Sequence, residues 1–305
     1  MTQTRVKSGA ARIRDWPRRA APAVFLAPAV ILLLLISIVP LCYSLYISTQ
    51  SYNIAMPSST IHFIGLQNYL KMLVKPEFHK AFGWTLQFAA AAVTAETVLG
   101  LAIALMLNSE NSQKYSGLFK TLFVIPMMIA PVVSATIWKL LFYPVYGVVN
   151  CTLELLGLGS VNWLGETFYA KIAVIIVEIW AATPFCILVY LAALKTVPSE
   201  MVEAARVDGA SAFQVFFNII LPAIRNFVAL VISIRLSDAL RVFDVIMQLT
   251  NGAPGVSTET IGTTIYKTAF RYNNIGEGSA GAFIFFVIVS AVAFTSMIFM
   301  RRRAD

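Results

Sequence analysis

The chain has 305 residues, of which 58% are apolar and only 12% are charged, and its formal net charge is +8. Soluble domains carry about 25% charged residues, so this composition excludes an ordinary soluble enzyme and indicates an integral membrane protein. Because the basic residues gather at the two ends and in loops, they indicate membrane topology, and no nucleic-acid partner is expected. The three cysteines have no metal-ligand or disulfide spacing.

The long apolar stretches predict an all-α, polytopic fold with six transmembrane helices. A helix needs about 20 apolar residues to cross the hydrocarbon core of a bilayer. The stretches that meet this length are residues 23–48, 82–107, 118–142, 171–194, 227–249 and 278–300. The first is too long for a signal peptide and lacks a cleavage site, so we expect it to be retained. Pro126 and Pro131 predict a bend in the third.

Orientation follows from the basic residues. Six spans place both ends of the chain on one side, together with the loops that follow the second and fourth spans. The positive-inside rule therefore predicts a cytoplasmic basic tail (residues 1–22), a cytoplasmic C-terminal tail (301–305) and, within the membrane domain (23–300), a cytoplasmic loop at 195–223. Lys114 lies in a loop on the same side, and the tails would also meet lipid headgroups. The opposite loops hold His62 and His79, whose spacing does not indicate a metal site.

The loop at 195–223 is far longer than the two to about eight residues that a simple helix connection needs. Pro198 and Glu200 are typical of a helix start, and Gly209 is typical of a helix end. Ser211 and Gln214 then fit a capping box, which predicts a second, amphipathic helix that carries several phenylalanines. Pro222 is expected to bend the chain into the fifth span. The loop is thus predicted to hold two short helices joined by a glycine hinge.

Several motifs resemble the ABC importer permeases. Within the loop, the matching residues are Glu203-Ala204-Ala205, Gly209 and Ile219-x-Leu221-Pro222, which resemble the EAA loop of that family. The segments that resemble its carbohydrate-uptake (maltose-type) branch are Val197-Pro198, Asp208-Gly209-Ala210, Phe63-x-Gly65-Leu66-x-Asn68-Tyr69 and Phe243-Asp244-Val245-Ile246 with Leu249–Pro254. In the last of these, Asn251 and Ala253 depart from the family pattern.

The resemblance implies a bacterial inner-membrane importer. Its other parts would be a second, related permease chain (a heterodimer), two ATP-binding subunits and a periplasmic solute-binding protein. By the same resemblance, the helix with Glu203 docks on an ATP-binding subunit, and the coupling residues are Glu200, Glu203, Ala204, Ala205, Asp208, Gly209, Leu221 and Pro222. Because the chain lacks a GxxxxGK[ST] loop, ATP and magnesium are expected on the partner subunits, and this chain is predicted to be a transport subunit without enzymatic activity, cofactor or metal.

Ionisable residues also lie within the predicted spans. Arg235, Asp238, Arg241 and Asp244 follow one another at intervals of three residues in the fifth span, which predicts ion pairs along one helix. Charged groups in a membrane usually face a cavity or a partner. These four would line the path of a solute, contact the second permease or neutralise one another inside the bundle. Glu96 and Glu178, in spans two and four, are each expected to satisfy a partner on another helix.

The predicted function is the permease subunit of an ATP-driven importer, forming half of the translocation path for a sugar or sugar derivative. Another solute, such as glycerol phosphate or a polyamine, is an alternative within the same family. A secondary transporter or channel is a further alternative, but it would not need the helical loop at 195–223. A membrane assembly protein without a substrate is another, which loss of solute uptake on deletion of the gene would exclude.

Overall fold

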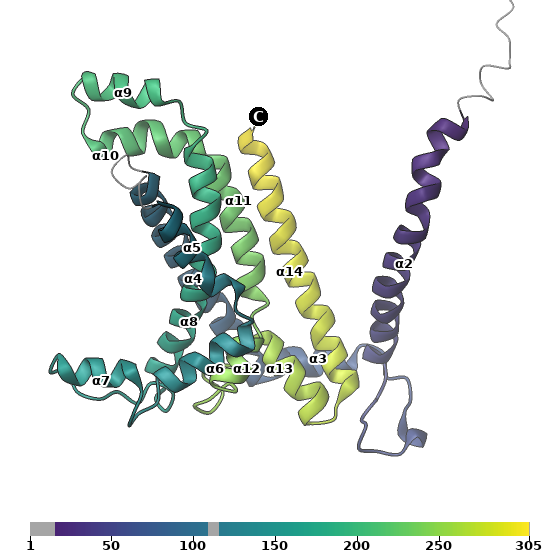
Figure 1. Ribbon diagram of the computed structural model, residues 1–305. Helices are drawn as coiled ribbons and strands as arrows, with labels where there is room; N and C mark the ends of the chain where they lie inside the picture. The colour runs from purple at the N-terminus through teal and green to yellow at the C-terminus, as the bar shows by residue number, and fades with distance from the viewer. Residues whose placement is uncertain (1–15, 109–115, 305) are drawn as a thin grey trace, which may run out of the picture.

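A computed structural model of the chain describes residues 16–108 and 116–304. In these ranges the regular elements are helices (Figure 1), which confirms the all-α prediction. The α-helices are α2 (Trp16–Ser48), α3 (Gln67–Val74), α4 (Pro76–Asn108), α5 (Ser116–Met128), α6 (Pro131–Leu141), α7 (Val148–Leu155), α8 (Thr167–Leu194), α9 (Ser199–Val207), α10 (Ala212–Val215), α11 (Leu221–Leu240), α12 (Asp244–Leu249), α13 (Ile261–Tyr266) and α14 (Ile275–Ala304). A short 3₁₀ helix at Ser58–Thr60 and π-helical turns at Phe216–Ile220 and Lys267–Arg271 complete the set.

The described residues contain five helices that are long and apolar enough to cross a membrane, and a bent pair supplies the sixth span. The spans are Phe25–Ser48, Pro76–Asn108, the pair Thr121–Met128 and Pro131–Leu141, Thr167–Leu194, Ala212–Leu240 and Ile275–Ser296. The predicted number of spans is therefore confirmed, although two of them differ from the prediction.

The third span is broken. Helices α5 and α6 meet at an angle of 103°. Ala130 has an extended backbone (ψ 140°) because the ring of Pro131 disfavours a helical conformation at the residue before it. The bend that Pro126 and Pro131 predict is present, and it is sharp enough to set α6 at the same end of the bundle as α12 and α13 (Figure 1).

The prediction of one fifth helix over 227–249 is wrong. The helix begins earlier, at Ala212, and ends at Leu240, and α12 starts separately at Asp244. The hydroxyl of Thr260 donates to the carbonyl oxygen of Val242 at 3.2 Å, so a distant segment satisfies a backbone group that the break leaves free. Asp244 instead lies in the first turn of α12, where a negative charge is favourable.

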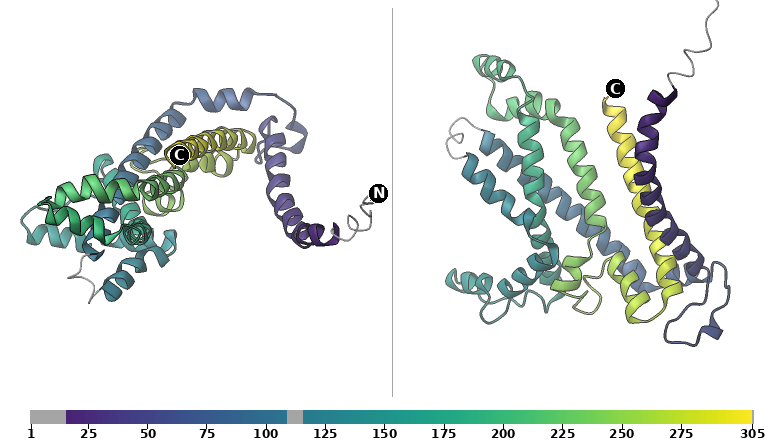
Figure 2. Two further views of the ribbon diagram at one scale, coloured as in Figure 1. Left: turned by 90° about the horizontal axis from the view of Figure 1, so that it is seen from above. Right: turned by 45° about the vertical axis from the view of Figure 1, so that its right-hand side comes forward.

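The long helices form a bundle around α4 and α8, with α11 and α14 packed beside them. Helix α2 stands at the edge, next to α14 (Figure 2). From Phe25 onward, most of its apolar side chains are exposed. Helices α9 and α10 lie at the same end of the bundle as the C-terminal end of α14 (Figure 1). The predicted topology likewise places the loop at 195–223 and the C-terminus on one side of the membrane. Residues 1–15 of the basic tail and Lys114 lie outside the described residues.

Helices α4 and α8 approach each other closely at Gly100. A Cβ atom at this position would lie 2.5 Å from the Cβ of Cys186, which is closer than two carbon atoms can pack. Small residues at such crossings allow membrane helices to pack closely. Close packing stabilises helix pairs in a bilayer, where burial of apolar side chains away from equally apolar lipid gives little free energy.

We predict that Gly100→Ala destabilises the protein although alanine is the better helix former. The added methyl group must push α4 and α8 apart, and overpacking of this kind costs about 1–3 kcal/mol. Gly83→Ala in the same helix is the matched control, because no atom lies within 4 Å of its Cβ position. The thermal unfolding midpoint of the purified protein should fall for Gly100→Ala only; an equal change in both variants would contradict the close approach.

Candidate functional site

The paired-helix loop that the sequence predicts is present. We call residues 198–220 the coupling handle. Helix α9 follows Pro198, and Gly209 has the left-handed backbone (φ +80°) that ends it. The capping box at the start of α10 is complete, because Gln214 N–H donates to Ser211 Oγ at 3.3 Å and Ser211 N–H donates to Gln214 Oε1 at 2.8 Å.

The handle is poorly covered by the rest of the chain. Helix α9 has no buried residue. The side chains of Val207, at its end, and Phe213, in α10, are 88% and 72% exposed. Glu203 and Arg206 line a groove of about 840 Å³ between the handle and the ends of α4 and α8. The remaining predicted coupling residues lie on α9 (Glu200, Ala204 and Ala205), at its C-cap (Asp208) and at the start of α11 (Leu221 and Pro222).

The handle continues into a membrane-spanning helix. From α10 the helical backbone passes through the π turn Phe216–Ile220 and Pro222 into α11, and the chain turns there (Figure 1). Prolines and π turns are the usual causes of such bends. The span Ala212–Leu240 has 29 residues, and a helix of that length is about 40 Å long. Helix α10 and the far end of α11 therefore belong to one helical segment.

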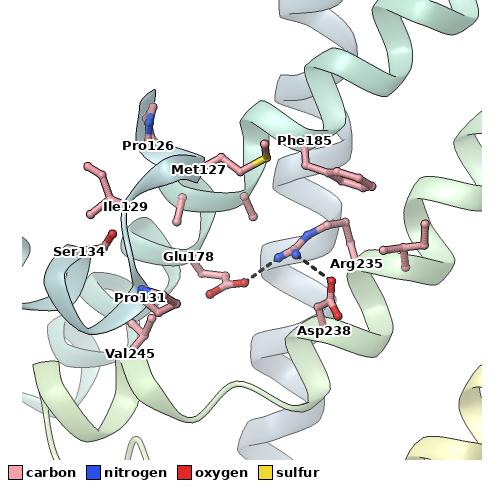
Figure 3. Close-up of a pocket in the computed structure, with 13 residues that line it drawn as sticks. Pro126, Met127, Ile129, Pro131, Ser134, Glu178, Phe185, Arg235, Asp238 and Val245 are labelled. Atoms are coloured by element: carbon pink, nitrogen blue, oxygen red, sulfur yellow. Dashed lines mark hydrogen bonds and ion pairs between the residues drawn. The ribbon is translucent and has the colours of Figure 1, made fainter. Parts of the chain in front are cut away.

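A group of five charged side chains, which we call the charge cluster, lies near that far end, and Figure 3 shows three of them: Glu178, Arg235 and Asp238. Its members are Glu96 on α4, Glu178 on α8, and Arg235, Asp238 and Arg241 on or next to α11. Arg235 donates from Nε to Glu96 Oε2 and from Nη2 to Glu178 Oε1, both at 2.7 Å. Asp238 accepts from Arg235 Nη1 at 3.4 Å and from Arg241 Nη2 at 2.9 Å.

The charge cluster becomes more exposed from one side to the other. The side chain of Glu96 is fully buried and that of Arg235 is 10% exposed, whereas Arg241 is 59% exposed. Buried charges are costly unless they are paired, and here a single guanidinium pairs with carboxylates from three helices. The expectation that Glu96 and Glu178 have helix partners is confirmed.

The predicted four-residue ladder is only partly correct. Arg235, Asp238 and Arg241 pair along the chain as expected, but Asp244 lies on α12 and is exposed. The two carboxylates on α4 and α8 hold Arg235 more closely than Asp238 does. Sequence spacing reveals pairs within one helix, and it carries no signal for partners on other helices.

The charge cluster borders a cavity of about 320 Å³, which we call the membrane cavity. The bend between α5 and α6, one face of α8, the end of α11 and Val245 of α12 surround it (Figure 3). Glu178, Arg235 and Asp238 form its charged wall, and Met127 and Phe185 belong to its apolar wall. Ser134, which is buried, also lines it, and its hydroxyl has no hydrogen-bond partner among the residues that the structure describes. Sequence analysis did not single out Ser134.

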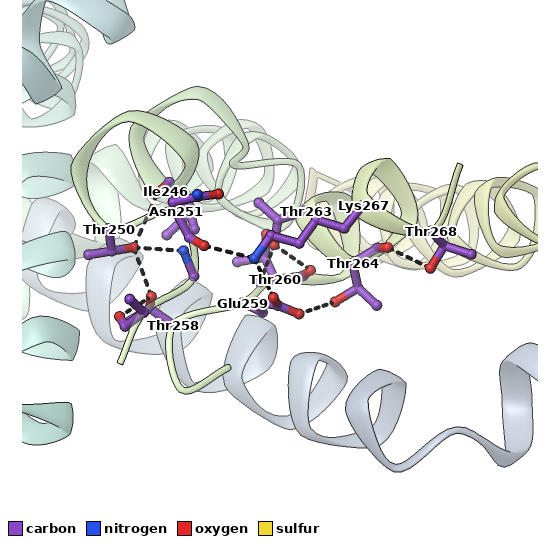
Figure 4. A network of polar contacts seen from close by, with 12 residues as sticks. Ile246, Thr250, Asn251, Thr258, Glu259, Thr260, Thr263, Thr264, Lys267 and Thr268 are labelled. Atoms are coloured by element: carbon purple, nitrogen blue, oxygen red, sulfur yellow. Dashed lines mark hydrogen bonds and ion pairs between the residues drawn. The ribbon is translucent and has the colours of Figure 1, made fainter. Parts of the chain in front are cut away.

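A second buried polar network fixes the turn that follows α12 (Figure 4). Lys267 Nζ donates to Glu259 Oε1 and to the carbonyl oxygen of Asn251, and Thr250 is hydrogen-bonded to Thr258. Gly252 is needed here, because a Cβ atom would lie 2.5 Å from Cγ of Glu259. This network holds the segment from Leu249 to Pro254 that carries the family resemblance. The buried Lys267–Glu259 pair was missed, since nothing local marks Lys267 as more than a loop cation.

The bundle of helices that are long and apolar enough to span a membrane defines a polytopic membrane protein. The chain belongs to the family described as "Binding-protein-dependent transport system inner membrane component", whose model matches residues 96–305.

Similar proteins cover almost the whole chain. It is 39% identical over 290 residues to "Probable ABC transporter permease protein y4oQ" of Sinorhizobium fredii (94% of this chain, 93% of the relative). It is 36% identical over 285 residues to "Trehalose/maltose transport system permease protein MalF" of Thermococcus litoralis (92% and 94%). A chain of a bacterial ABC transporter involved in the import of the acidic polysaccharide alginate has the same fold, with a TM-score of 0.82, 25% identity and coverage of 95% and 99%.

We predict that Arg235→Met lowers the stability of the protein by about 3–5 kcal/mol, the usual cost of removing one partner from a buried ion pair. The loss arises because Glu96 and Glu178 are left without a counter-charge. In a Glu96→Gln/Glu178→Gln background the same substitution should cost much less. Denaturation of the wild-type protein, Arg235→Met, the double Gln variant and the triple variant measures the cost of Arg235→Met in each background. An equal cost in the two backgrounds would refute the pairing.

Proposed function

We propose that this chain is the permease subunit of an ATP-driven importer for a sugar or sugar derivative. It would form half of the translocation path in a bacterial inner membrane, with both termini in the cytoplasm. Membership of the family supports the transport role, and the relative named for trehalose and maltose supports the solute class. A second permease and a periplasmic binding protein would complete the importer.

The observation that carries the proposal is the exposed coupling handle. Apolar side chains at the end of a membrane bundle are unfavourable in water, and groups of them mark a surface that another protein covers. Val207 and Phe213 are such side chains, joined by Met201 and Phe217, which are 54% and 45% exposed. We assign this surface to an ATP-binding subunit, which would supply ATP, magnesium and the hydrolytic step.

Force would then reach the solute through α11. Closure of the ATP-binding subunits would displace α10, and the continuous helix from Ala212 to Leu240 would carry this movement to Arg235 and Asp238. The membrane cavity beside these residues would be part of the solute path, with the second permease closing its open side. Arg241, at the exposed edge of the charge cluster, would lie at the boundary between the two permeases. Asp244 would not take part, because it lies on α12.

The docking role is tested by Val207→Asp. A charge at the centre of an apolar contact should release the ATP-binding subunit, so less of it should copurify with the tagged permease. Val207→Thr is the control, since threonine has the same shape and no charge. Copurification that is unchanged for Val207→Asp would contradict the assignment of this surface.

The coupling role is tested at the glycine hinge. Gly209 has φ +80° and space for a side chain, so Gly209→Val strains the backbone without a steric clash. We expect transport to fall about tenfold or more while ATP hydrolysis continues, because misplacement of a positioning element commonly costs on that scale. Gly157→Val, which has the same backbone strain (φ +75°) and the same free space at the opposite end of the bundle, should transport normally. Equal transport by the two variants would argue against coupling through the handle.

A further inference from the structure

We propose that the membrane cavity admits uncharged saccharides and excludes acidic ones, so that the cargo carries no carboxylate, sulfate or phosphate group. This inference rests on the proposed function, and it narrows the solute class by the charges on the cavity wall. An anion that enters a poorly hydrated cavity needs a counter-charge or hydrogen-bond donors to replace water. Whether an anion binds in the cavity therefore depends on whether a charged group of the wall is free to pair with it.

The cation in the cavity wall is already engaged. Each of the three side-chain nitrogens of Arg235 faces a carboxylate: Nε and Nη2 pair with Glu96 and Glu178, and Nη1 faces Asp238. Arg241 does not line the cavity, and it donates to Asp238 and to the carbonyl oxygen of Ser237. The charge cluster therefore holds three carboxylates and two guanidinium groups, and an acidic saccharide would meet no available cation there.

The groups that remain available suit hydroxyl groups instead. Glu178 uses Oε1 on Arg235, and in the described part of the chain its other carboxylate oxygen has no hydrogen-bond partner, so it can accept from a hydroxyl. Ser134 supplies an independent sign of a ligand. The residue lines the cavity, and its buried hydroxyl has no hydrogen-bond partner within residues 16–108 and 116–304. A buried polar group without a partner is costly, and rotation of the Ser134 side chain toward the cavity would let a saccharide hydroxyl satisfy it.

The apolar wall and the size of the cavity fit the same cargo. Met127 and Phe185 can pack on the C–H face of a sugar ring, opposite the charged wall. The volume of about 320 Å³ lies at the small end of ligand pockets, which suits one or two sugar rings. The solved chain of similar fold belongs to a bacterial ABC transporter involved in the import of the acidic polysaccharide alginate. Charge on the cavity wall, rather than the shared fold, would then separate the two kinds of cargo.

The test measures the binding of saccharides to the membrane cavity, and the periplasmic binding protein is left out so that its own selectivity does not contribute. The importer, assembled from both permeases and the ATP-binding subunits in nanodiscs, is titrated with maltose, trehalose and digalacturonic acid, and binding is followed by saturation-transfer NMR. We expect at least one neutral disaccharide to bind about tenfold more tightly than digalacturonic acid, because juxtaposed like charges cost affinity on that scale or above. Ser134→Ala should weaken the binding of the neutral disaccharide.

Substitution of the carboxylates in the cavity wall shows whether they cause the preference for a neutral disaccharide. Glu178→Gln/Asp238→Asn keeps the shape of the wall and leaves Arg235 with one carboxylate, so the preference for the neutral disaccharide should shrink about tenfold. Glu154→Gln, which removes an exposed carboxylate on α7, should leave the preference unchanged. Equal binding of digalacturonic acid and the neutral disaccharides, binding of none of them, or a preference that the double variant leaves intact would overturn the inference. ATP hydrolysis that depends on the handle, measured in the same nanodiscs, reports separately on the proposed function.

Discussion

Arg235 is a permanently charged group that lies almost completely buried within a membrane-spanning bundle. Such a charge must be paired, and the partners come from α4, α8 and its own helix. This requirement fixes how the three helices meet at one level of the bundle. It also fixes the charged wall of the membrane cavity, because Glu178 and Asp238, two of the three carboxylates that pair with Arg235, line that cavity.

The same helix connects this site to the opposite end of the molecule. Helix α11 continues through a π turn into α10, so the coupling handle and the charge cluster lie on one helical segment. Helix α11 ends at Leu240, and the following helix, α12, packs against α6 next to the cavity. In the proposed mechanism, a movement of the handle would reach the level of the bundle at which the buried charges are concentrated. Transport and selectivity would thus depend on one structural element.

The features that sequence predicts correctly here are local ones. Ser211 with Gln214 and the left-handed Gly209 follow from short-range backbone chemistry, and the number of spans follows from apolar length. The missed features depend on contacts between distant residues. Arg235 and Glu96 are 139 residues apart, and the break after Leu240 is supported by Thr260. Spacing along one helix predicted a ladder that included Asp244, because a sequence pattern does not reveal that the helix ends first.

The central claim is that force enters the bundle through the coupling handle when an ATP-binding subunit covers it. Hydrogen–deuterium exchange of the permease, alone and in the assembled importer, tests this most directly. Amides of α9 and α10 should exchange rapidly in the permease alone and be protected in the assembly, while exchange in α7, at the opposite end, should not change when the ATP-binding subunits bind. Exchange in α9 and α10 that is equally rapid in both preparations would contradict the central claim.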